Sequence, residues 1–190
     1  AEVLGIPFED VTPEQRSHAK AVNFGIIYGI SDFGLAKQLG IPRKQAADYI
    51  EAYFKRYPSI HDFMHSMVDK AKETGRAVTL FGRYRELPDI NSKNFNRRSF
   101  AERTAMNTPI QGTAADIMKM AMIEVYKKMK QGGYKSRVLL QVHDELVAEV
   151  VNEEKEEIAN LLKTTMESVV NLKVPLVADV NEGKNWAETK

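Results

Sequence analysis

Residues 12–29, TPEQRSHAKAVNFGIIYG, predict one two-faced helix near the start of the chain. Thr12 and Gln15 have the spacing of a capping box, and Pro13 stands at the first helical position, so the helix should begin here and extend to about Tyr28. At about 100° per residue, one face of this helix is apolar. That face consists of Ala19, Val22 and Ile26.

The opposite face of this helix combines two cations with two aromatic rings at intervals of four residues. Its members are Arg16, Lys20, Phe24 and Tyr28, followed by Gly29. The helix macrodipole disfavours cations in the first turns, so this placement indicates that an anion such as a triphosphate binds there. The rings would stack on a sugar or base, because a flat ring accepts any base. The spacing alone also fits an ordinary amphipathic helix with solvated cations and core aromatics.

Composition predicts a globular protein. With 190 residues, 43% of them hydrophobic and 28% charged, the chain can bury roughly 70% of its unfolded surface. No apolar run reaches the ~20 residues of a membrane span, and residues 1–5 lack a basic leader, so we expect a cytoplasmic protein. The absence of cysteine excludes disulfides and thiolate zinc sites, so any metal ion would have oxygen or imidazole ligands. Because the chain opens without methionine, we interpret it as part of something longer.

The net charge of +1 conceals an uneven distribution along the chain. Residues 76–103 hold seven basic and three acidic side chains, whereas residues 144–190 hold eleven acidic side chains and five lysines. A surface that faces a polyanion, with an acidic region elsewhere, would give this division. A solvated mixed surface could give it too.

Apolar periodicity and helix breakers predict a mostly helical α+β fold with a small antiparallel sheet. The expected helices are 12–28, 32–39, 42–57, 60–74, 97 to a break near 109, 109–131 and 153–170. Strand patterns predict a short basic hairpin between 76 and 86, a second hairpin from 138–142 and 146–150, and a last strand at 176–180. The break near 109 is expected because Thr108, Pro109 and Gln111 repeat the capping-box arrangement.

The second hairpin would place Asp144 at its tip, between two apolar strands. Magnesium prefers few carboxylates together with phosphates and water, so one fixed aspartate is a plausible half-site. Two-metal nucleotidyl transfer needs a further carboxylate on a neighbouring strand. Glu145 follows at once but points to the other strand face, so it could only assist. A polar hairpin turn, in which aspartate is common, is the alternative.

Hydrogen-bonding side chains recur at four-residue intervals at Arg103, Asn107 and Gln111. Such donors can contact the minor-groove acceptors that all base pairs share, which allows a duplex to be recognised whatever its sequence. Gln111 could instead cap its own helix. Four further arginines would contact phosphates and add affinity that falls with salt. They are Arg83, Arg85, Arg97 and Arg98.

Three of these stretches resemble motifs of family A DNA polymerases, the bacterial DNA polymerase I group, and they occur in the family's order. The row from Arg16 to Gly29 resembles the fingers-helix motif, residues 101–116 resemble a palm stretch, and residues 139–145, LLQVHDE, resemble the second catalytic motif. The resemblance covers residues 12–186, nearly the whole chain. Tyr84 and Glu86 depart from a family habit of consecutive basic residues followed by an aromatic.

The resemblance implies a role for each matching residue. Arg16 and Lys20 would bind the incoming triphosphate, and Lys20 would also be a catalytic residue. Phe24 would stack on the nucleotide, and Tyr28 would guard the insertion site. Asp144 would be a metal ligand, assisted by the catalytic Glu145, and His143 would contact the primer end. Three residues of the palm stretch would contact primer and template from the minor-groove side. They are Arg103, Asn107 and Gln111.

The resemblance thus predicts a C-terminal polymerase fragment, with fingers at residues 1–75 and the distal palm at 76–190. The parent would be a bacterial, cytoplasmic, nucleoid-associated monomer. With two Mg²⁺ ions it would add deoxynucleoside triphosphates to the primer 3′-hydroxyl of primer-template DNA. The strand with the other catalytic aspartate, in an Asp-Tyr-Ser type motif, is not in the chain, so we expect the fragment alone to be inactive. A non-catalytic nucleic-acid-binding module and a helical scaffold with a fortuitous anion site are the competing hypotheses.

Overall fold

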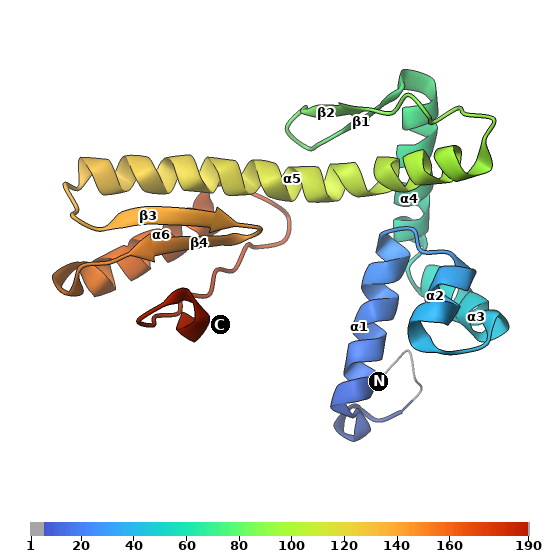
Figure 1. The fold of residues 1–190 in the computed structure, drawn as a ribbon, viewed down its shortest axis with the longest axis horizontal. Helices are drawn as coiled ribbons and strands as arrows, with labels where there is room; N and C mark the ends of the chain where they lie inside the picture. The colour runs from blue at the N-terminus through green and yellow to red at the C-terminus, as the bar shows by residue number, and fades with distance from the viewer. Residues whose placement is uncertain (1–5, 190) are drawn as a thin grey trace. The chain divides into compact units, whose positions relative to one another are not determined.

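The computed structural model describes residues 6–189 and confirms a mostly helical α+β fold with two small antiparallel hairpins (Figure 1). Residues 1–5, where the sequence shows no basic leader, and Lys190 lie outside the described residues. The chain divides into two compact units between Ile110 and Gln111. The long helix α5 (Phe95–Gln131) contributes to both units. This division rests on backbone contacts and does not test the fingers and palm boundary predicted at residue 75.

The first unit contains four helices before α5, and their boundaries follow the predicted caps. They are α1 (Pro13–Ile27), α2 (Asp32–Leu39), α3 (Arg43–Arg56) and α4 (Pro58–Thr74), preceded by the 3-10 turn η1 (Phe8–Asp10). The Thr12 hydroxyl accepts a hydrogen bond from the Gln15 amide at 3.2 Å, and the Gln15 side chain accepts one from the Thr12 amide at 2.9 Å. The predicted capping box is therefore confirmed.

Two apolar clusters stabilise the first unit. One joins α1, α2 and α3 through Val22, Ile26, Leu35, Ala36, Ala46 and Tyr53. The other lies between α4, the start of α5 and the predicted basic hairpin, which forms from β1 (Arg76–Val78) and β2 (Tyr84–Glu86). Its buried residues are Ala71, Ala77, Leu87, Ile90, Ala101 and Ala105. Burial of Val22 and Ile26 fixes α1 with its opposite face toward solvent.

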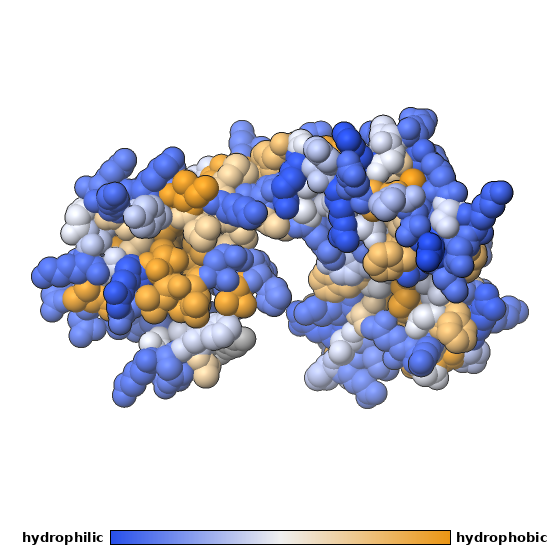
Figure 2. Space-filling model, turned by 45° about the horizontal axis from the view of Figure 1, so that its top comes forward, coloured by the Kyte–Doolittle hydropathy of each residue, from blue (hydrophilic) through white to orange (hydrophobic). Residues whose placement is uncertain are grey.

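The second unit packs the end of α5 against a hairpin and helix α6 (Lys155–Ser168). Strands β3 (Arg137–Val142) and β4 (Glu145–Glu149) pair antiparallel, as predicted, with a bulge between Val138 and Leu140. The buried core is Val125, Met129 and Ile158. Short 3-10 turns follow β4 and end the described chain, at η2 (Asn152–Glu154) and η3 (Trp186–Thr189). Apolar side chains remain visible on part of the surface in Figure 2. On β3, Leu139 and Leu140 are half-exposed.

Two secondary-structure predictions are wrong. Helix α5 continues through Pro109, where a break was expected. The Thr108 hydroxyl does not cap a new helix, because it donates to the Thr104 carbonyl one turn earlier at 2.7 Å. The last strand, predicted at 176–180, does not form, because a strand needs a neighbouring strand as its hydrogen-bond partner. In this segment the Ala178 amide instead donates to the side chain of Glu167, at 3.0 Å from Oε1.

A buried serine and a carboxylate tie the start of β3 to η2. Glu154 accepts hydrogen bonds from the Lys135 amide, the Ser136 amide and the Ser136 hydroxyl, at 3.0, 2.9 and 2.6 Å. The Ser136 hydroxyl in turn accepts from the Val151 amide at 3.0 Å. The hydrogen bond from the Ser136 hydroxyl, followed by those from the two amides, lowers the pKa of Glu154 below its ordinary value of 4.5.

We expect Glu154→Gln to lower the thermal midpoint of the chain at pH 7, because the amide replaces a charged acceptor of three hydrogen bonds. A depressed folded-state pKa adds stability above pH 4.5, and this stability is lost as the pH falls through the folded value. Thermal melts from pH 7 to pH 3 should therefore show the variant and the wild type converging at the acid end. Glu153→Gln, at the neighbouring position, is the control. An unchanged midpoint for Glu154→Gln at pH 7 would contradict this role.

Among residues 6–189, no helix is long and apolar enough to cross a lipid bilayer.

Candidate functional site

The four predicted nucleotide-binding residues all lie on the exposed face of α1. Arg16, Lys20, Phe24 and Tyr28 are solvent-accessible, and the two rings are 45% and 36% exposed. The two rings are therefore not buried in the core of this unit. The Phe24 and Tyr28 rings stack with their centroids 6.2 Å apart, and Lys20 Nζ lies 5.9 Å from the Phe24 centroid. The cations and rings form one continuous polar and aromatic surface.

Gly29 brings the end of α1 against α5. Its φ is +74°, in the left-handed region that favours glycine. A Cβ at this position would lie 2.5 Å from Met106 Cε and 3.3 Å from Arg103 Cγ. Gly29 directly follows Tyr28, the predicted guard residue, and lies close to Arg103, one of the predicted minor-groove residues.

We expect Gly29→Ala to destabilise the chain by about 1–2 kcal/mol from backbone strain, with a further cost because Met106 must move. Gly40→Ala is the matched control, since Gly40 has a φ of +67° but no atom within 4 Å of a new Cβ. Urea unfolding should give a larger loss at Gly29 than at Gly40. The two losses would be equal if the contact with α5 were absent.

The predicted minor-groove residues follow one another at one-turn intervals along α5, because this helix is not broken at Pro109. Arg103 Nη1 donates to the Ser99 hydroxyl at 2.9 Å, which fixes the direction of its side chain. Asn107 Oδ1 is buried and has no hydrogen-bond partner within residues 6–189. Such an orphaned acceptor is rare in folded proteins. Gln111 is exposed and lies inside the continuous helix α5, so the alternative that it caps a new helix is wrong.

The four predicted phosphate-contacting arginines lie around the first hairpin and the start of α5. Arg83, Arg85 and Arg97 are exposed, and Arg98 Nη1 donates to the Ser92 carbonyl at 2.8 Å. Two further hairpin residues take part in local contacts, since Arg76 pairs with Glu86 at 3.2 Å and covers the ring of Tyr84. Tyr84 and Glu86, the two departures from the family pattern, therefore both contact Arg76 within the hairpin.

The predicted catalytic carboxylate stands at the tip of the second hairpin. His143 and Asp144 connect β3 to β4, and both are exposed. His143 has a φ of +52°, a conformation that few non-glycine residues adopt. Its carbonyl accepts a hydrogen bond from Gln141 Nε2 at 2.7 Å, which helps to hold the turn. No side-chain hydrogen bond or ion pair of Asp144 occurs within the described part of the chain.

Sequence reasoning missed a residue that positions Glu145. Trp186 Nε1, in η3, donates to Glu145 Oε2 at 3.3 Å. This bond joins the end of the described chain to the first residue of β4, 41 positions earlier. Trp186 is the single tryptophan of the sequence, and its rarity was the one feature of the sequence that could have drawn attention to it. The orientation of the Glu145 carboxylate therefore depends on a contact that no local motif contains.

The chemistry of the hairpin tip fits a magnesium half-site. Residues 6–189 contain no cluster of three or more histidine, aspartate or glutamate side chains placed to hold a metal ion. Asp144 offers one exposed hard oxygen ligand with no competing partner among these residues, and Glu145 lies beside it in sequence. A lone carboxylate suits Mg²⁺ only when phosphates, water and another carboxylate complete the coordination.

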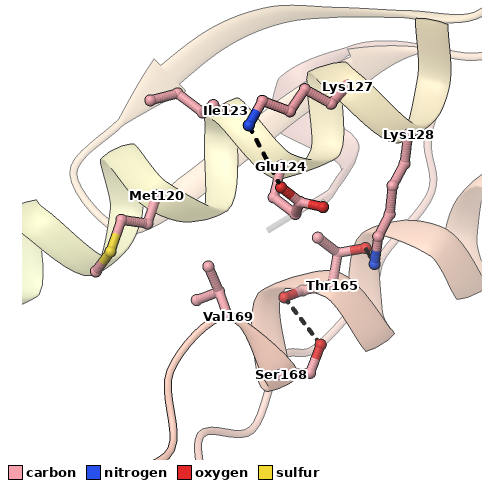
Figure 3. Close-up of a pocket in the computed structure, with 8 residues that line it drawn as sticks. All are labelled: Met120, Ile123, Glu124, Lys127, Lys128, Thr165, Ser168 and Val169. Atoms are coloured by element: carbon pink, nitrogen blue, oxygen red, sulfur yellow. Dashed lines mark hydrogen bonds and ion pairs between the residues drawn. The ribbon is translucent and has the colours of Figure 1, made fainter. Parts of the chain in front are cut away.

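A cleft of about 450 Å³ in the second unit contains none of the predicted site residues (Figure 3). It lies between α5 and the end of α6. Lys128 Nζ donates to the buried Thr165 hydroxyl at 3.1 Å, and Lys127 pairs with Glu124 at 3.9 Å. Both lysines of the cleft therefore already have partners in their own unit.

Comparison with known proteins gives the family. The sequence profile described as DNA polymerase family A matches residues 1–188. The chain belongs to this polymerase family. It is 56% identical over 190 residues to a DNA polymerase I of Caldicellulosiruptor bescii, covering all of this chain and 22% of that protein. It is 57% identical over 182 residues to a DNA polymerase I of Streptococcus pneumoniae, covering 96% of this chain and 21% of that protein.

A solved structure of the same family has the same fold. It is described as the POL domain of Pol1 from M. smegmatis in complex with DNA primer-template and dNTP. The TM-score is 0.94 at 43% identity, and the match covers 98% of this chain and 33% of that chain. The predicted family and fold class are thus confirmed. This chain spans about a fifth of the length of the curated polymerases described above.

Proposed function

We propose that the intact protein is a DNA-directed DNA polymerase acting in replication and repair, and that this chain supplies its nucleotide-binding helix and one catalytic carboxylate. In the reaction, the primer 3′-hydroxyl oxygen forms a bond to the α-phosphorus of a deoxynucleoside triphosphate. The bond from that phosphorus to the bridging oxygen breaks, and pyrophosphate leaves with the electron pair. The hydroxyl proton passes to solvent.

The exposed row on α1 is the observation that supports this proposal most strongly. Arg16 and Lys20 would hold the triphosphate, and Lys20 would neutralise charge on the leaving pyrophosphate. Phe24 would stack on the sugar and base, and Tyr28 would cover the insertion position. The match to the family covers this stretch of the chain.

The α5 row and the arginines would bind primer-template DNA. Arg103, Asn107 and Gln111 would contact the minor groove, where the orphaned Asn107 acceptor would gain a donor. Arg83, Arg85, Arg97 and Arg98 would contact phosphates.

At the hairpin tip, Asp144 would bind magnesium, Glu145 would assist while held by Trp186, and His143 would contact the primer end. Two Mg²⁺ ions in the intact protein would lower the pKa of the primer hydroxyl and neutralise phosphate charge. The second carboxylate would come from a part of the protein that this chain does not include. We propose that the intact protein is a bacterial, cytoplasmic, nucleoid-associated monomer.

The isolated chain should bind a deoxynucleoside triphosphate weakly and extend no primer. Fluorescence titration with a labelled nucleotide should show weaker binding after Arg16→Ala, because a triphosphate contact is lost, and unchanged binding after Lys37→Ala, an exposed lysine on α2. Equal binding by both variants would refute the role of α1. Primer extension by the purified chain would refute the need for a second carboxylate.

A further inference from the structure

Two histidines on α4 lie outside every function proposed above. His61 and His65 are separated by one helical turn, so both project from the same side of the helix. Their ring centroids are 4.3 Å apart, with an angle of 50° between the ring planes. His65 is exposed, and the side chain of His61 is 45% exposed. Solvent ions can therefore reach both rings.

Neighbouring side chains orient the His61 ring. The ring makes an edge contact with Phe54 of α3, at a centroid distance of 5.0 Å. Its Nδ1 lies 3.4 Å from Asp62 Oδ1. A carboxylate beside one ring nitrogen holds the proton there and leaves the lone pair on the other nitrogen, as in carboxylate-histidine-metal arrangements. Nε2 of His61 is then the ligand atom.

We propose that His61 and His65 bind a divalent transition-metal ion, such as Zn²⁺, Ni²⁺ or Cu²⁺, through two imidazole nitrogens. Neutral imidazole suits these ions, whereas Mg²⁺ takes oxygen ligands. Two histidines at positions i and i+4 of a helix are the spacing that zinc-binding helices use. Because residues 6–189 offer no third ligand in a cluster, water completes the coordination.

A bound ion would join two successive turns of α4. This helix buries Met64 and Ala71 and lies against α3 through the Phe54 contact. Since an ion that binds only the folded state raises its stability, Ni²⁺ should raise the thermal midpoint of the chain.

Paramagnetic broadening of histidine ring signals in NMR tests the site on the 190-residue chain, which has four histidines. Substoichiometric Ni²⁺ should broaden the signals of His61 and His65 before that of His18. Excess Mg²⁺ should not reverse the effect.

Two variants complete the test. His61→Gln and His65→Gln should each weaken Ni²⁺ binding about tenfold or more, because loss of an orienting partner alone already costs that much. His18→Gln should leave binding unchanged. Broadening that begins at His18, or broadening of His18 equal to that of His61 and His65, would overturn the proposal. Unchanged Ni²⁺ affinity in the exposed-residue variant His65→Gln would overturn it as well.

Discussion

In the intact protein, Asp144→Asn is expected to reduce primer extension about a thousandfold while leaving DNA binding nearly unchanged. The substitution preserves size and removes the negative charge that would hold Mg²⁺. No side-chain hydrogen bond or ion pair of Asp144 exists within residues 6–189, so the fold loses nothing. The measurement is single-turnover extension at saturating nucleotide, alongside a binding titration with labelled primer-template DNA.

Glu149→Gln is the matched control on the same hairpin. Its carboxylate pairs with Arg137 at 2.8 Å on the surface, and exposed pairs of this kind contribute little to stability. Extension by this variant should match that of the wild type. If Asp144→Asn left extension intact, or if the wild type showed no metal-dependent activity, the non-catalytic nucleic-acid-binding module would be the better account.

Lys20→Ala is expected to lower kcat/KM for nucleotide addition by about 10²–10³ in the intact protein, the usual loss when one preorganised group that stabilises transition-state charge is removed. Within the described residues Lys20 forms no ion pair, and its contact is with the Phe24 ring at 5.9 Å. Exposed contacts between a cation and a ring contribute roughly 0.5–1 kcal/mol, so stability should barely change. A large kinetic loss with an unchanged melting midpoint separates a binding role from a structural role.

Lys37→Ala, with an exposed lysine in the last turn of α2, is the control for general loss of positive charge. Its kcat/KM should match the wild type at one salt concentration and across a salt series. A similar loss in both lysine variants would mean that long-range attraction, and not a contact with triphosphate, accounts for the effect.

The fold was predictable where local signals agree with tertiary packing. The capping box at Thr12 and the predicted ranges 32–39 and 60–74 agree with the structure, where Ser31 caps the start of α2 and Gly40 and Gly75 end α2 and α4. Each of these signals satisfies backbone groups within one turn. The exposed row on α1 was predictable for the same reason: its spacing follows helix geometry and its opposite face is apolar.

Predictions failed where the outcome depends on distant residues. Helix α5 continues through Pro109, with Ala105 buried before it and Met118 buried after it, so the local capping signal did not decide where a helix begins. A strand at 176–180 would need a partner from elsewhere. The Trp186 contact with Glu145 spans 41 positions and carries no local signature.

The roles of the site residues come from the family motifs and remain predictions, since composition and spacing alone could not choose between a polar turn and a metal ligand at Asp144.

A crystal structure of the intact protein with primer-template DNA, a deoxynucleoside triphosphate and Mg²⁺ tests the central claim most directly. One triphosphate should contact Arg16 and Lys20 and also share a metal ion with the carboxylate of Asp144. A nucleotide bound away from α1, or a metal ion that contacts the triphosphate without Asp144 as a ligand, would contradict it.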